Sequence, residues 1–223
     1  MQFDEVRYIH CFAASSCLQF SKSNITNNIN NLTNINTFNY LPDKPAMNVK
    51  RGGEWVTWSY KQYHSDSRTV AKAFIKLGLE RHHAVGILGF NAPEWFIALA
   101  AAISAGGISC GIYTTNSPQV CKYIADLSRA NIVVIEDEKQ LDKILAVRSE
   151  LPHLKAIVQY MGTPRTEGVL SWRELLQIGS KETDNALEER LKRIAINQCC
   201  GLIFTSGTTG MPKVRVVLRN VKC

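Results

Sequence analysis

The chain has 223 residues, with 45% hydrophobic and 20% charged side chains and a formal net charge of +7. Its length suits one sizeable domain or two small ones, and its composition is ordinary for a globular protein. The basic residues form no dense stripe interleaved with aromatic side chains, so nothing indicates a nucleic-acid partner. The seven cysteines include no C-x-x-C pair, which argues against a zinc site or a disulfide framework and favours a reducing compartment.

The first forty residues differ in composition from the rest. Asparagine dominates 21–40, and such a polar, low-complexity tract buries too little apolar area to offset its ordering entropy. We therefore expect 1–40 to be a divergent, partly disordered leader, 41–213 to be folded, and 214–223 to be a divergent basic tail. Because acidic residues and His10 flank or interrupt the first apolar stretch, a secretory signal is not expected.

From residue 54 onward, short apolar strands alternate with segments of helical periodicity. A strand is expected at 54–57, followed by a helix that Ser59 opens and Gly78 ends. Further strands are expected at 85–90, 108–113, 132–135, 156–159 and 202–205. Further helices are expected at 94–105, from Ser117-Pro118 onward, and at 139–151, 171–178 and 186–194. This alternation predicts an α/β fold, a largely parallel sheet flanked by helices on both faces, with ligands at the carboxyl ends of its strands.

An uncharged run from Trp95 to Cys121 is long enough to be mistaken for a membrane span. Pro93 and Glu94 suit the start of a helix, however, and Gly106-Gly107 suits its end. We therefore interpret the run as a buried helix followed by a buried strand, and we expect no transmembrane segment.

A hydroxyl-rich loop follows the last predicted strand, with the sequence T-S-G-T-T-G-M-P-K from Thr205 to Lys213. Its glycines let several backbone N–H groups converge, its hydroxyls add donors, and its lysine adds a cation, a combination that suits a polyphosphate. The Walker motif G-x-x-x-x-G-K-[ST] does not fit, because Pro212 stands at its second glycine and Val214 at its hydroxyl position. This mismatch disfavours an independent phosphotransferase. The alternative to a phosphate loop is a polar hairpin that binds no ligand. The four hydroxyl side chains, and Pro212-Lys213 at the end of the loop, argue against it.

The segment from Ser206 to Lys213 resembles the signature loop of the adenylate-forming (AMP-dependent synthetase and ligase) superfamily. Other segments resemble long-chain acyl-CoA synthetases, most of all their bubblegum branch: G-F-N-A-P-E-W-F from Gly89, A-G-G-I from Ala105, G-I-Y-T-T-N-S-P from Gly111 and N-Q-C-C from Asn197. The resemblance covers 41–213, which is thereby identified with the front part of the N-terminal domain of such an enzyme.

The resemblance implies a long-chain fatty acid–CoA ligase. In such enzymes a fatty carboxylate attacks the α-phosphate of Mg²⁺-bound ATP, and the thiol of coenzyme A then displaces AMP from the acyl-adenylate. In family members, positions that follow the phosphate loop supply the acidic Mg²⁺ ligand, the aspartate that binds ribose and the catalytic lysine. No catalytic or metal-binding residue is therefore assigned in the present sequence. The resemblance assigns contact with the ATP phosphates to Thr205, Ser206, Gly207, Thr208, Thr209, Gly210 and Lys213.

After Lys213 the sequence departs from the family pattern, which continues with glycine where Val214 stands. If that position needs a left-handed backbone, a β-branched valine would cost about 1–3 kcal/mol. We expect a truncated ligase that is inactive alone; the alternative is a non-catalytic variant that binds nucleotide weakly or modulates a full-length relative. A cytoplasmic location is expected, with peripheral contact at the endoplasmic reticulum membrane left open because of the basic tail.

Three further groups of residues are better explained by structural roles than by catalysis or metal binding. His82-His83 precedes a strand without nearby Cys or Asp, which favours a solvated turn over a metal site. Cys199-Cys200 is interpreted as a pair of small buried hydrophobic residues rather than nucleophiles. Glu136-Asp137-Glu138 is interpreted as a helix start, where acidic side chains complement the helix dipole, rather than a metal site.

Overall fold

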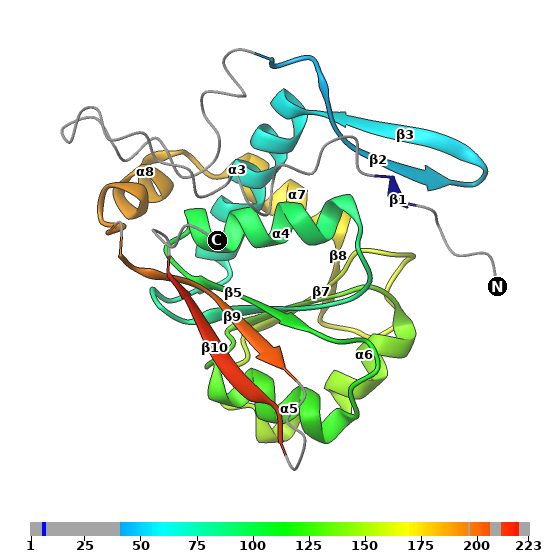
Figure 1. Ribbon diagram of the computed structural model, residues 1–223, viewed down its shortest axis with the longest axis vertical. Helices are drawn as coiled ribbons and strands as arrows, with labels where there is room; N and C mark the ends of the chain where they lie inside the picture. The colour runs from blue at the N-terminus through cyan, green and yellow to red at the C-terminus, as the bar shows by residue number, and fades with distance from the viewer. Residues whose placement is uncertain (1–5, 8–40, 196, 206–210, 219–223) are drawn as a thin grey trace.

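The computed structural model describes residues 6–7, 41–195, 197–205 and 211–218. Within these residues a seven-stranded sheet has the order β10-β9-β5-β4-β6-β7-β8, and a smaller sheet has the order β1-β2-β3 (Figure 1). The predicted Asn-rich tract at 21–40 lies outside the described residues. The two sheets lie on opposite sides of a layer of helices, so the large sheet alone forms the centre of the fold.

The large sheet is parallel except at one edge. The four adjacent strands β4, β5, β6 and β7 are apolar and almost wholly buried, as expected for parallel strands covered on both faces. The strand β10 runs antiparallel to β9, whereas every other neighbouring pair is parallel. The bounds are β4 Ala84–Leu88, β5 Ile108–Ile112, β6 Ile132–Ile135, β7 Ala156–Gln159, β8 Val169–Ser171, β9 Cys199–Thr205 and β10 Lys213–Leu218.

Helices cover both faces of this sheet (Figure 1). One face packs against α3 Tyr60–Lys76, α4 Pro93–Ser104, α7 Trp172–Lys181 and α8 Asn185–Lys192. The other face packs against α5 Pro118–Leu127 and α6 Glu138–Leu145. Successive residues of a strand point to opposite faces, so Val134 belongs to the first core and Ile135 to the second. The α/β fold with a largely parallel sheet is therefore confirmed.

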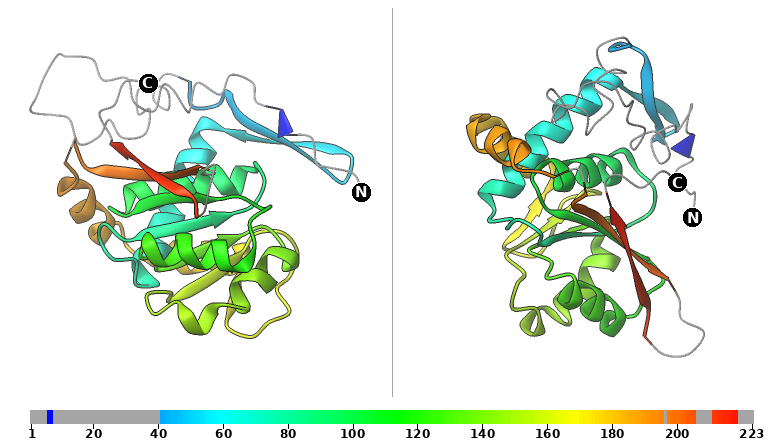
Figure 2. Two further views of the ribbon diagram at one scale, coloured as in Figure 1. Left: turned by 60° about the horizontal axis from the view of Figure 1, so that its bottom comes forward. Right: turned by 60° about the vertical axis from the view of Figure 1, so that its left-hand side comes forward.

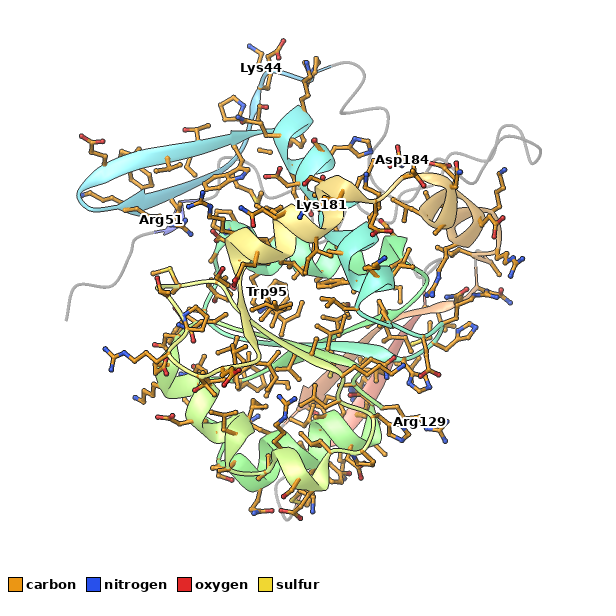
Figure 3. All side chains as sticks on the ribbon, turned by 180° about the vertical axis from the view of Figure 1, so that it is seen from behind. Lys44, Arg51, Trp95, Arg129, Lys181 and Asp184 are labelled. Atoms are coloured by element: carbon orange, nitrogen blue, oxygen red, sulfur yellow. The ribbon has the colours of Figure 1, made fainter. Side chains whose placement is uncertain are left out.

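Close helix contacts hold the first layer together. The helices α3 and α7 each begin with a capping box, built on Ser59 and Ser171. Gly179 of α7 lies against α3 so tightly that a Cβ atom there would stand 2.0 Å from the carbonyl oxygen of Thr69. Asp184, labelled in Figure 3, accepts a 3.0 Å ion pair from Lys72 and so fastens the start of α8 to α3.

The small sheet is a hairpin of β2 Pro45–Arg51 and β3 Glu54–Ser59, with β1 Val6–Arg7 paired antiparallel to β2. Arg51 connects this hairpin to the main body, because its guanidinium lies 2.7 Å from the buried carboxylate of Glu94 at the start of α4. Trp95, the next residue, points into the layer between the sheet and its covering helices (Figure 3). The predicted leader thus contributes at least one short strand to the described structure.

Several predicted elements differ from those observed. The run from Trp95 to Cys121 forms most of α4, then β5 and the start of α5, as the helix-then-strand interpretation required. Within the described residues, no helix combines the length and apolar character needed to cross a membrane. The predicted helix at 139–151 was wrong in its second half: α6 ends at Leu145, and a short 3-10 turn, Arg148–Glu150, follows. Between the two lies Val147, which is 1% exposed and belongs to the second core.

Candidate phosphate-binding site

The predicted phosphate loop connects β9 to β10. Phe204, the penultimate residue of β9, is 2% exposed and is packed into the core beneath α5 and α6. Its neighbour Thr205 therefore points to the opposite face of the sheet, where it is exposed. The buried phenylalanine thereby anchors the end of β9 in the core, immediately before the loop begins.

The two ends of the loop lie opposite each other. Lys213, the first residue of β10, pairs with Thr205 in the antiparallel ladder, so the side chains of both residues occupy the same face. Both are exposed, and Arg215 follows on the same face two residues later. A hydroxyl and two cations thus share one open surface. The other predicted site residues, Ser206, Gly207, Thr208, Thr209 and Gly210, lie outside the described residues.

This arrangement suits an anionic group. Lysine supplies three donors and a compact charge, and an exposed threonine hydroxyl adds one more donor. The strand β9 runs parallel to β5 and β4, so its carboxyl end lies at the same edge of the sheet as theirs. That edge is where ligands bind in open α/β sheets. The location and the chemistry of Thr205 and Lys213 are thus compatible with the predicted contact with phosphate oxygens.

The expected strain at Val214 is absent. Among the described residues, the non-glycine positions with a left-handed backbone are His82 and Arg129. Val214 instead lies within β10 and pairs with Phe204, an extended conformation that favours β-branched residues. The condition under which valine would be strained, a positive φ at position 214, is therefore not met, because residues 213–218 form a strand.

The loop that follows β4 is clamped at the same edge. The carboxylate of Glu136 accepts a 3.0 Å hydrogen bond from the backbone N–H of Phe90, and the phenol of Tyr160 donates a 3.1 Å bond to the carbonyl of Phe90. Burial, reinforced by the charge of Glu136, raises the pKa of the Tyr160 phenol, which keeps it protonated as a donor. Gly89 is required here, because a Cβ atom would lie 2.2 Å from the phenolic oxygen.

This clamp holds a large aromatic side chain in an open position: Phe90 is 58% exposed. Tyr113, which follows β5 at the same edge, is 59% exposed. Sequence reasoning missed the clamp. Its signal was the position of Glu136 and Tyr160, each directly after a buried parallel strand, where side chains from neighbouring strands converge.

The three groups with plainer explanations have structural partners, although His83 is packed rather than solvated and Glu136 bonds to Phe90 rather than serving the start of α6. Asp137 caps α6 by accepting from the backbone of Gln140. Cys200 is buried, and burial raises the pKa of the half-buried Cys199 thiol, which lowers its nucleophilic thiolate fraction. His83 packs edge-on against His153, with ring centroids 5.6 Å apart. Within the part of the chain that the structure describes, no group of three or more His, Cys, Asp or Glu side chains could hold a metal ion.

Comparison with known proteins decides the family. The family model described as AMP-binding enzyme matches residues 36–219, which is most of the chain and slightly more than the predicted 41–213. The chain belongs to the AMP-binding enzyme family. Among solved structures, this family member resembles the anthranilate CoA ligase AuaEII in complex with anthranoyl-AMP, with a TM-score of 0.65 and 26% identity over 74% of this chain and 30% of that one.

Similar sequences are long-chain-fatty-acid–CoA ligases. This chain is 51% identical to ACSBG2 of Xenopus laevis and 49% identical to ACSBG1 of Bos taurus, each over 79% of this chain. It spans only 24% and 25% of those two ligases. A red-emitting luciferase of Phrixothrix hirtus shares the fold, with a TM-score of 0.62 and 22% identity over 83% of this chain and 34% of the luciferase.

Proposed function

We propose that this chain forms the phosphate-binding front part of an ATP-dependent long-chain fatty acid–CoA ligase. The observation that carries the proposal is the pairing of Thr205 with Lys213 on one exposed face, at the carboxyl edge of the parallel sheet. The similarity to long-chain-fatty-acid–CoA ligases supports the choice of reaction. The substrates would be a long-chain fatty acid, ATP and coenzyme A, and a magnesium ion accompanying the triphosphate remains a prediction.

The reaction has two steps. A carboxylate oxygen of the fatty acid attacks the α-phosphorus of ATP, so that an acyl–oxygen–phosphorus bond forms and pyrophosphate leaves with the electrons of the broken phosphoanhydride bond. The thiol of coenzyme A, after losing its proton, then attacks the acyl carbon, a thioester forms and AMP leaves. In the first step the enzyme must hold the triphosphate in line and stabilise the charge that develops on the departing pyrophosphate.

Lys213 and Thr205 would serve that first step. The ammonium group of Lys213 would approach the β- and γ-phosphate oxygens, and the hydroxyl of Thr205 would donate one hydrogen bond to them. Because the ladder holds their backbones opposite each other, little ordering is needed before binding. We assign the same phosphate-binding role to Ser206, Gly207, Thr208, Thr209 and Gly210. A cytoplasmic location with peripheral contact at the endoplasmic reticulum membrane also stays a prediction.

Titration of the purified chain with ATP in the presence of Mg²⁺, followed by calorimetry, tests the phosphate assignment. A charge-assisted hydrogen bond contributes about 1.5–3 kcal/mol, so Lys213→Ala should weaken ATP binding about tenfold or more. The matched control is Lys192→Ala, which removes an equally exposed cation at the end of α8. Equal ATP affinity in the Lys213 variant and the unaltered chain would contradict the assignment.

A second assay tests whether the chain catalyses the reaction by itself or only binds nucleotide. Incubation of the chain with palmitate, Mg²⁺-ATP and coenzyme A should yield no appreciable acyl-CoA, because the phosphate loop supplies only part of the machinery. Accumulation of acyl-CoA would overturn the prediction that this chain is inactive alone. Binding of ATP without turnover would fit the alternative of a non-catalytic nucleotide binder.

A further inference from the structure

Two arginines meet where α4 and α8 end, at the amino side of the parallel sheet (Figures 1 and 2). Arg190 of α8 donates a 3.0 Å hydrogen bond from Nη1 to the carbonyl oxygen of Ala105, which ends α4. Arg81 donates a 3.0 Å bond from Nη2 to the carbonyl oxygen of Arg193, which ends α8. Gly106 lies between them, because a Cβ atom there would stand 3.8 Å from the stem of each arginine.

Among the described residues, no carboxylate pairs with either of these arginines. Glu80, the neighbour of Arg81 in sequence, pairs with Lys155 instead. Glu189 adjoins Arg190 in α8, but successive residues of a helix do not face each other. Burial, and then the charge of Arg81, lowers the pKa of the Arg190 guanidinium, so the two cations repel each other. The buried Nε of Arg81 has no hydrogen-bond partner within the described part of the chain.

Helix capping explains only part of this arrangement. Cations complement the C-terminal end of a helix dipole, which is equivalent to about half a negative charge. Two such helix ends therefore leave Arg81 and Arg190 with a net charge of about +1, and each carbonyl bond uses one of the five N–H groups of an arginine. The exposed side chain of Arg193 adds a third cation at the same helix end. The cluster thus carries a positive charge that an anion would neutralise.

We propose that Arg81 and Arg190 form a binding site for a phosphate group at the amino side of the sheet, separate from the phosphate loop at its carboxyl edge. Planar guanidinium groups match phosphate oxygens with paired N–H donors. Both side chains are half-buried rather than enclosed in the core, so an anion can reach them. The phosphate belongs either to a soluble ligand or to a lipid headgroup, and vesicle binding separates these two sources.

Titration of the full chain with inorganic phosphate, followed by calorimetry at an ionic strength held constant with chloride, tests the proposal. Arg190→Gln should raise the dissociation constant about tenfold or more, because it removes charged donors. The matched control Arg173→Gln removes an exposed cation of α7 and should change the constant less than about twofold. Repeating the titrations in a Lys213→Ala background removes the cation of the phosphate loop, so the two sites can fail separately. Circular dichroism establishes that each variant keeps its fold.

Chemical labelling keeps the proposal testable if Arg190→Gln fails to fold. Phenylglyoxal modifies arginine side chains, and mass spectrometry after digestion locates the modified residues in the unaltered chain. At constant ionic strength, phosphate should slow the modification of Arg81 and Arg190 at least about threefold and leave that of Arg173 unchanged. Equal protection of all three residues would contradict a site at Arg81 and Arg190.

Vesicles of phosphatidylcholine with and without phosphatidic acid identify the source of the phosphate. Co-sedimentation that requires phosphatidic acid and is lost in Arg190→Gln assigns the site to a headgroup. Binding of inorganic phosphate without vesicle binding assigns it to a soluble ligand. Absence of both, or phosphate binding that Arg190→Gln leaves unchanged, would overturn the proposal. Because ATP enters none of these measurements, the result is independent of the proposed ligase function.

Discussion

The contact between Gly89 and Tyr160 gives a prediction whose sign and size follow from distances. A Cβ atom at position 89 would stand 2.2 Å from the Tyr160 oxygen, 2.9 Å from Cβ of Glu136 and 3.0 Å from Cζ of Tyr160. Tyr160 is 6% exposed and bonded to Phe90, so its ring has little freedom to move away. Overpacking of this kind costs about 1–3 kcal/mol, and we expect Gly89→Ala to destabilise the fold by about 2 kcal/mol.

Removing the phenolic oxygen should relieve part of this cost. Tyr160→Phe alone loses one hydrogen bond and should destabilise by about 1 kcal/mol. In the double variant the shortest contact disappears while the contacts with Glu136 and with the ring remain. We therefore expect the double variant to be destabilised by about 2 kcal/mol rather than the additive 3, a coupling of about 1 kcal/mol.

Urea unfolding followed by circular dichroism measures these free energies, provided that the slope of the transition is unchanged between variants. A buried site elsewhere gives the control: Leu187→Ala combined with Gly89→Ala should be additive, because the fully buried Leu187 lies in α8, which contacts Ala105 at the amino end of β5, the opposite edge of the sheet from Gly89. Additivity of Gly89→Ala with Tyr160→Phe, within about 0.3–0.5 kcal/mol, would refute the proposed geometry of the clamp.

Two further predictions concern charge. Glu94→Gln removes the 4%-exposed carboxylate that pairs with Arg51 and should lower the free energy of unfolding by about 1–3 kcal/mol. This is less than the usual cost of breaking a buried ion pair, because water reaches Arg51. The control Glu150→Gln removes one partner of an exposed pair with Lys122 and should cost less than about 0.5 kcal/mol. Burial, and then the charge of Arg68, lowers the pKa of His64 below 6.5, so the unfolded chain binds more protons there and thermal stability should fall as pH decreases through and below 6.5. His64→Gln should flatten that part of the profile, and an unchanged melting profile in the variant would contradict the assignment.

Most of the parallel core could be predicted from the sequence, because polar segments and capping residues clearly mark the ends of its elements. The strands Ile132–Ile135 and Ala156–Gln159 were predicted with the observed bounds, since each is a short apolar run between polar segments. Ser117-Pro118 likewise marked the start of α5, where Ser117 accepts from the backbone of Val120. Local sequence signals therefore sufficed to place such elements.

Elements that depend on long-range pairing were harder to predict. The strand β8 has three residues and is defined by its pairing with β7, and β10 is defined by its pairing with β9. The strand β8 is too short to give a strong local signal. The valines of β10 do favour a strand, but the departure of Val214 from the family pattern diverted attention from that signal. The phosphate loop stays a prediction from its local sequence pattern, whereas the clamp on Phe90 joins three segments whose proximity only the assembled sheet reveals.

That clamp also constrains how the fold assembles. The hydrogen bonds to Phe90 come from residues 46 and 70 positions further along the chain, so closing them requires β4, β6 and β7 to be side by side. Contacts of such separation form late, because chain entropy must be lost before they are made. The amide of Phe90 donates its hydrogen bond at the exposed surface, so its proton should exchange with solvent through local opening of the clamp rather than through cooperative opening of the sheet.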